Sequence, residues 1–100
     1  MRPEVAALAN LGPLPSEKSA SPELVGRYEL LYRAIQRPVS DDEARVLARL
    51  LGQDDCFGLA VSFVHLIETA PGWPLADCLG DTKNIWISEL KARAMRSGRL

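Results

Sequence analysis

The segment from Cys56 to Ile67 constrains the fold more than any other part of this chain. Nine of its twelve residues are apolar. At helical spacing these side chains point to nearly every side of the cylinder, and a helix that is apolar all round belongs in the middle of a bundle. We therefore expect a central helix over about residues 55–70. Gly58 lowers its helix propensity, and close approach of a neighbouring helix would compensate for this.

A helix over residues 22–36 is expected before this segment. The Ser21 hydroxyl can cap it and Pro22 suits its first position. Pro38 ends the run, because a proline disfavours helical geometry in the residue before it.

The best local signal in the sequence is a capping box. The Ser40 hydroxyl can accept the Glu43 amide N–H, while the Glu43 side chain returns to the amide of Ser40. This pattern predicts a helix over residues 40–51. Asp54 or Asp55 can cap the central helix that follows.

The last helix is expected over residues 82–97, capped by Asp81 or Thr82. No segment shows the alternation of a strand bounded by hairpin turns. The fold class is therefore all-α, a compact bundle of four main helices around the apolar third one. Short connections favour antiparallel neighbours.

The N-terminal region has a weaker helical pattern than the rest of the chain. Residues 3–10 are compatible with a short helix, and residues 12–21 are rich in chain breakers and small polar side chains. We interpret residues 1–21 as a short helix with a flexible connector, and residues 22–100 as a single helical domain.

Composition excludes some function classes. The formal net charge is −1, and affinity for nucleic acid or anionic lipid rests on a basic surface. The longest apolar stretch is too short to span a bilayer. The first ten residues do not resemble a signal peptide, and two cysteines are too few for a disulfide scaffold. These features indicate a cytoplasmic protein without nucleic-acid or membrane partners.

Catalytic signals are weak. His65 and Glu68 have the i, i+3 spacing of helical metal sites, but nothing duplicates the pair. We therefore favour the interpretation in which Glu68 caps the helix and His65 is partly buried. Cys56 lies too far from His65 along one helix for a thiol–imidazole pair. Cys78 could approach either of these residues from the following loop. We expect a non-enzymatic protein without metal or cofactor, and keep a metal or thiol enzyme as a minor alternative.

The turn around Trp73 is the candidate binding site. Two prolines restrict it, and rigid aromatic residues are typical anchors of protein interfaces. Glu68, Asp77 and Asp81 flank it, so a basic protein partner is expected. In the alternative interpretation Trp73 covers the core, and the acidic residues 54–81 are neutralised by the basic residues 82–100.

Two function classes remain. The first is a small cytosolic protein that occupies a surface of another protein, the class to which inhibitors and the immunity proteins of bacterial toxins belong. The second is a self-associating structural or oligomerisation domain. It would use the apolar residues that fall off the main helical stripes, which are Tyr32, Val46, Leu50 and Ile87.

Overall fold

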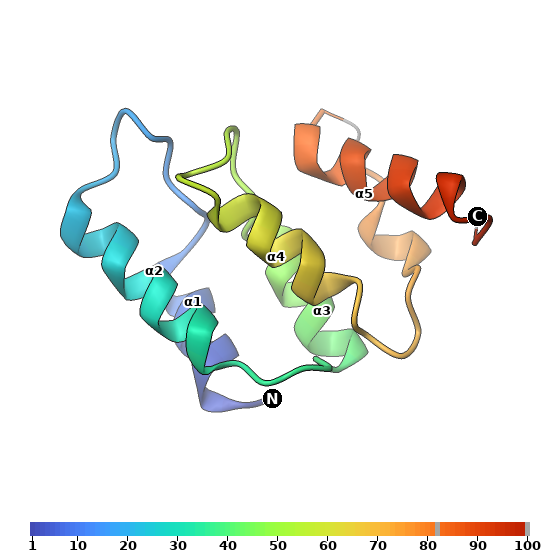
Figure 1. Cartoon of the computed structure of the whole chain (residues 1–100), viewed down its shortest axis with the longest axis horizontal. Helices are drawn as coiled ribbons and strands as arrows, with labels where there is room; N and C mark the ends of the chain where they lie inside the picture. The colour runs from blue at the N-terminus through green and yellow to red at the C-terminus, as the bar shows by residue number, and fades with distance from the viewer. Residues whose placement is uncertain (82, 100) are drawn as a thin grey trace.

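Helices account for all the regular structure in residues 1–81 and 83–99, the part of the chain that this computed structural model describes (Figure 1). They are α1 (Pro3–Leu11), α2 (Pro22–Ala34), α3 (Asp41–Arg49), α4 (Leu59–Ile67), the 3₁₀ helix η1 (Ala76–Cys78) and α5 (Ile85–Arg96). The all-α class is confirmed, and every expected helix is present. Within these residues, none of the helices has the length and apolar character needed to cross a membrane.

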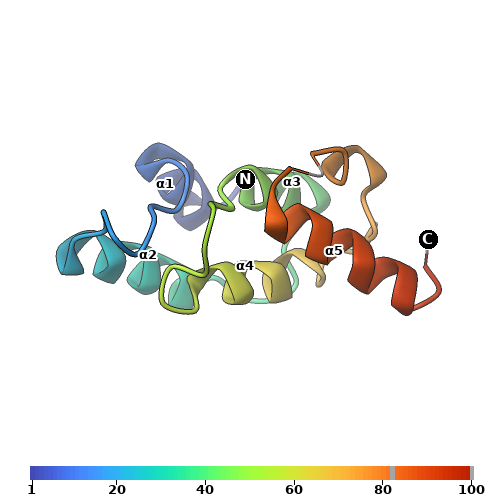
Figure 2. The same ribbon diagram turned by 90° about the horizontal axis from the view of Figure 1, so that it is seen from above.

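The helices form two layers (Figure 2). One layer holds α1 and α3, and the other holds α2 and α4, while α5 slants in Figure 2 from the level of α3 to the level of α4. Helix α4 contacts α2, α3 and α5, so it occupies the central place expected from its apolar sequence. The molecule is 17 Å thick in its shortest direction, which agrees with two helix layers whose axes lie about 8–10 Å apart.

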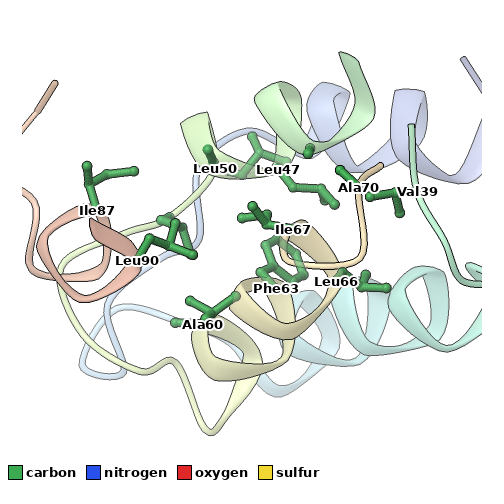
Figure 3. Packing of buried hydrophobic residues seen from close by; sticks show 14 of the residues in the cluster. Val39, Leu47, Leu50, Ala60, Phe63, Leu66, Ile67, Ala70, Ile87 and Leu90 are labelled. Atoms are coloured by element: carbon green, nitrogen blue, oxygen red, sulfur yellow. The ribbon is translucent and has the colours of Figure 1, made fainter. Parts of the chain in front are cut away.

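The core lies between the layers. Phe63 and Ile67 of α4 are fully buried and point toward Leu47 of α3, while Leu90 approaches from α5 (Figure 3). Burying a side chain of this size contributes about 1.5–3 kcal/mol. The face of α4 that points between the layers therefore holds the fold together.

The N-terminal region is part of the same core. Val5 of α1 is fully buried. The Tyr28 hydroxyl lies 2.7–3.2 Å from the carbonyl oxygens of residues 11–13. The Leu14 N–H donates to the Leu50 carbonyl oxygen over 2.8 Å. These contacts attach the connector after α1 to α2 and to the end of α3.

The expected capping box at α3 is confirmed. The Glu43 N–H donates to the Ser40 hydroxyl over 3.1 Å, and the Ser40 N–H donates to the Glu43 carboxylate over 2.9 Å. Arg2 completes the arrangement, because its guanidinium binds the same carboxylate and also reaches the carbonyl oxygens of Gln36 and Pro38. Glu43 is only 4% exposed, whereas the Arg2 side chain is 28% exposed. This partly buried ion pair ties the segment before α1 to α3.

The cap of α5 differs from the expectation. The Asn84 side chain accepts the N–H groups of Trp86 and Ile87, so the helix begins at Ile85. Asp81 instead accepts the Lys83 N–H, and Thr82 lies outside the described residues. Asn84 also donates to carbonyl oxygens of the segment after α3, so the residue that caps α5 also attaches it to the domain.

Candidate binding surface

Trp73 does not present an exposed ring. Its side chain is 8% exposed and belongs to the core. The turn that carries it is held at both sides: the Trp73 N–H donates to the Ala70 carbonyl, and the Gly72 N–H donates to the Asp41 carboxylate at the start of α3. Trp73 therefore covers the core, as the alternative interpretation held, and the expectation of an exposed aromatic anchor there is wrong.

The surroundings of Trp73 are basic rather than acidic. A hollow of about 440 Å³ is lined by Glu68, Trp73, Arg93, Arg96, Ser97 and Arg99. Glu68 accepts two hydrogen bonds of 2.8 Å from Arg93. Its carboxylate is thus neutralised by the basic last helix, as the alternative interpretation predicts for this residue.

Asp77 and Asp81 lie at a different place. Both line a cleft of about 380 Å³ between α3, η1 and the start of α5. Arg45 donates to Asp77 over 2.9 Å and to Asp42 over 2.8 Å, and its hydrogen bond lowers the pKa of Asp77. The four residues predicted to form one site are therefore divided between two hollows, and two of them are engaged in ion pairs.

Both thiols considered for catalysis have a raised pKa. Burial, with the charge of Asp54 next in size, raises the pKa of the Cys56 thiol. Burial and Asp77 likewise raise the pKa of Cys78. His65 is exposed, not partly buried as expected, because one face of α4 is open to solvent. No cluster of three or more His, Cys, Asp or Glu side chains placed to hold a metal ion occurs in residues 1–81 and 83–99.

The residues predicted for self-association do not form an exposed surface. Leu50 and Ile87 are each only 5% exposed. Tyr32 and Val46 are half-buried and pack against the core.

The largest departure from the expected structure is a left-handed turn before α4. Cys56, Phe57 and Gly58 have φ angles of 45°, 56° and 91°. Such angles cost about 1–2 kcal/mol in each residue that carries a Cβ. The helix therefore begins at Leu59, with Gly58 as its N-cap rather than inside it. A Cβ at Gly58 would meet open space, so the expected close neighbour is absent.

The turn places one side chain in the core and the next on the surface of the protein. Cys56 is fully buried, whereas Phe57 is 62% exposed. In Figure 1 the loop before α4 projects between α2 and α5. An aromatic side chain assigned to the core by its sequence context is thus displayed on the surface, and Gly58 was the one local signal of a break in the helix at this point.

Hydrogen bonds from three parts of the chain hold this turn in place. The Phe57 N–H donates to the Glu17 carboxylate over 2.9 Å. The Asp54 carboxylate accepts the N–H groups of Cys56 and Glu17, each over 3.0 Å. The Trp86 indole N–H of α5 donates to the Asp54 carbonyl oxygen over 3.0 Å. The exposed ring is therefore carried by a backbone that hydrogen bonds from other parts of the chain hold in place.

A shallow hollow of about 240 Å³ lies beside Phe57, between α2 and the start of α4. Its apolar lining is formed by Val25 and Tyr32 from α2, and by Phe57 and Leu59 from the turn and α4. Glu29 and Arg33, which form an i, i+4 ion pair on α2, also line it. Phe57 and this hollow, whose lining is about equally polar and apolar, together form what we call the Phe57 surface.

Comparison of the chain with protein-family models, with curated proteins and with solved structures found no match.

Proposed function

We propose that this protein is a small, non-enzymatic binding protein that acts in the cytosol by occupying a surface of another protein. We further propose that the Phe57 surface, and not the Trp73 turn, makes the contact. The observation that carries the proposal is the state of Phe57, which is 62% exposed while its backbone is held in a left-handed conformation.

Two costs coincide at this residue. A large aromatic ring in water forgoes most of the free energy that its burial would contribute. A left-handed backbone adds strain, and strained residues persist only where the surroundings hold them. Neither of these unfavourable contributions is offset by contacts of the ring in the core, since Phe57 points away from it. A role as a binding anchor explains both the exposed ring and the strained backbone, because interface hot spots are often aromatic residues fixed before binding.

The proposal is tested by affinity capture from a lysate of the source cell with the wild-type chain, Phe57→Ala and Leu30→Ala. Leu30 is the matched control: it is 73% exposed on α2 and does not line the hollow. We expect one protein to be retained by the wild type and by Leu30→Ala. Its purified form should bind Phe57→Ala at least about tenfold more weakly.

Two outcomes would contradict the proposal. One is capture that Phe57→Ala leaves unchanged, with circular dichroism showing that both variants fold. The other is recovery of this chain alone together with a mass in sedimentation equilibrium that rises with concentration. That second result would support the self-association domain instead.

A further inference from the structure

Three acidic side chains hold the turn that carries Phe57 or the first turn of α4 next to it. Glu17 and Asp54 hold the turn directly, and the Asp55 carboxylate accepts the Val61 N–H over 3.2 Å in the first turn of α4. Within residues 1–81 and 83–99, none of these three carboxylates forms an ion pair with an arginine or lysine.

Several carboxylates elsewhere are paired with arginines, whereas within the described residues Glu4, Glu23, Asp41 and Asp81 are not. Glu43 is bound by Arg2, Glu68 by Arg93, and Asp77 by Arg45. The charges that the fold neutralises internally are thus at other sites.

The charges of Glu29 and Arg33, which line the hollow, cancel in their ion pair, and Lys18 follows Glu17 in the sequence. With Lys18 counted, the three carboxylates leave a local net charge of −2. These carboxylates also keep acceptor capacity: Glu17 uses one oxygen for the Phe57 N–H, and Asp55 uses one for Val61. In the described part of the chain, the second oxygen of each accepts no hydrogen bond. The turn that carries the exposed ring is therefore bordered by backbone-bound carboxylates that can each accept a further donor.

This combination is chemically specific. A cation placed over the face of an aromatic ring is attracted by the ring quadrupole, and nearby carboxylates add charge-assisted hydrogen bonds. An arginine satisfies both, because its planar guanidinium stacks on the ring while its N–H groups reach carboxylates. A local negative field also raises the rate at which a positively charged partner associates.

We infer that the partner is a basic protein that places an arginine or lysine side chain over Phe57, between the carboxylates of Glu17 and Asp55, with an adjacent apolar side chain in the hollow beside it. This inference rests on the proposed function and adds the chemistry of the occupant. A partner with a neutral or acidic contact surface would leave the three carboxylates without compensation.

The test uses the full ¹⁵N-labelled chain and three synthetic peptides of equal length, which alternate leucine with arginine, glutamine or glutamate. Chemical shifts are followed during titration. We expect the arginine–leucine peptide to shift the amide signals of Phe57, Gly58 and Val61, and its affinity to fall as salt is raised. The glutamate–leucine peptide should cause no such shifts.

Charge variants provide the control. Glu17→Gln with Asp55→Asn keeps the oxygen acceptors that hold the turn and removes both charges; we expect it to weaken binding of the arginine–leucine peptide at least about tenfold. Glu23→Gln removes an exposed charge in the first turn of α2 and should leave the affinity within about twofold.

The outcomes separate the two proposals. If the glutamine–leucine peptide shifts the same signals with equal affinity, the inferred charge recognition is wrong while Phe57 remains a contact residue. If the arginine–leucine peptide leaves these signals unmoved, or binds the Glu17/Asp55 variant as tightly as wild type, the inference is overturned. The capture experiment with Phe57→Ala then decides the proposed function separately.

Discussion

Removing the charge of Glu43 should destabilise the protein by several kcal/mol at neutral pH. Its carboxylate is 4% exposed and accepts hydrogen bonds from the Ser40 N–H and from the Arg2 N–H and guanidinium. Burial alone would raise the pKa of Glu43, but these bonds outweigh it and lower the pKa from 4.5 to about 2. At about 1.4 kcal/mol per pH unit, this lowering corresponds to about 3 kcal/mol. Breaking a buried ion pair costs a similar amount, about 3–5 kcal/mol.

The pH dependence of the free energy of unfolding shows whether the charge of Glu43 causes this stabilisation. Because the pKa is lower in the folded than in the unfolded protein, Glu43 contributes its full stability above pH 4.5 and loses it as the pH falls toward about 2. Urea unfolding of wild type and Glu43→Gln, measured by circular dichroism across this range, should show a difference of about 3 kcal/mol at neutral pH that shrinks with acidification.

Glu89→Gln is the matched control, since the same chemical change then falls on an exposed ion pair with Arg96. It should cost no more than about 1 kcal/mol. A difference for Glu43→Gln that is equally small, or that stays constant down to pH 2, would refute the reasoning.

Two further predictions concern the backbone. A Cβ at Gly26, inside α2, meets no atom within 4 Å, whereas one at Gly52 would lie 2.5 Å from the Leu14 carbonyl oxygen. Gly26→Ala should therefore stabilise by about 0.5–1 kcal/mol and Gly52→Ala should destabilise by about 1–3 kcal/mol in chemical denaturation; the reverse order would contradict the packing described. Phe57→Gly relieves a left-handed backbone and loses a ring that is 62% exposed, so thermal and urea unfolding should place its stability within about 1 kcal/mol of wild type. A loss above about 2 kcal/mol would mean that the ring supports the fold.

Most of the fold could be predicted from the sequence because its signals are local. The capping box of Ser40 and Glu43 depends on two side chains three residues apart, and the cap of Ser21 with Pro22 on adjacent ones. The central position of α4 follows from its apolar residues alone. The ion pair of Glu43 with Arg2 was not predicted, because a local sequence pattern gives no information about a partner 41 residues away.

The candidate site could not be predicted, because it depends on the sign of a backbone angle. Cys56 and Phe57 fit a helical pattern as well as they fit any other, and only Gly58 hints at a left-handed turn. Trp73 presents the reverse case. Its flanking acidic residues in the sequence suggested an acidic rim, but folding brings Arg93 and its neighbours from the last helix to that place. Charge near a residue in sequence is a poor guide to charge near it in space.

The attachment of α1 also has a consequence for the order of events during synthesis. Its nine residues are too few for a stable isolated helix in water. Its buried face packs on α2 and α3, and Arg2 can bind Glu43 only when both are outside the ribosome. Helix α1 therefore leaves the ribosome before the two helices it packs on, and Val5 and Leu8 stay exposed to chaperones until α3 has emerged.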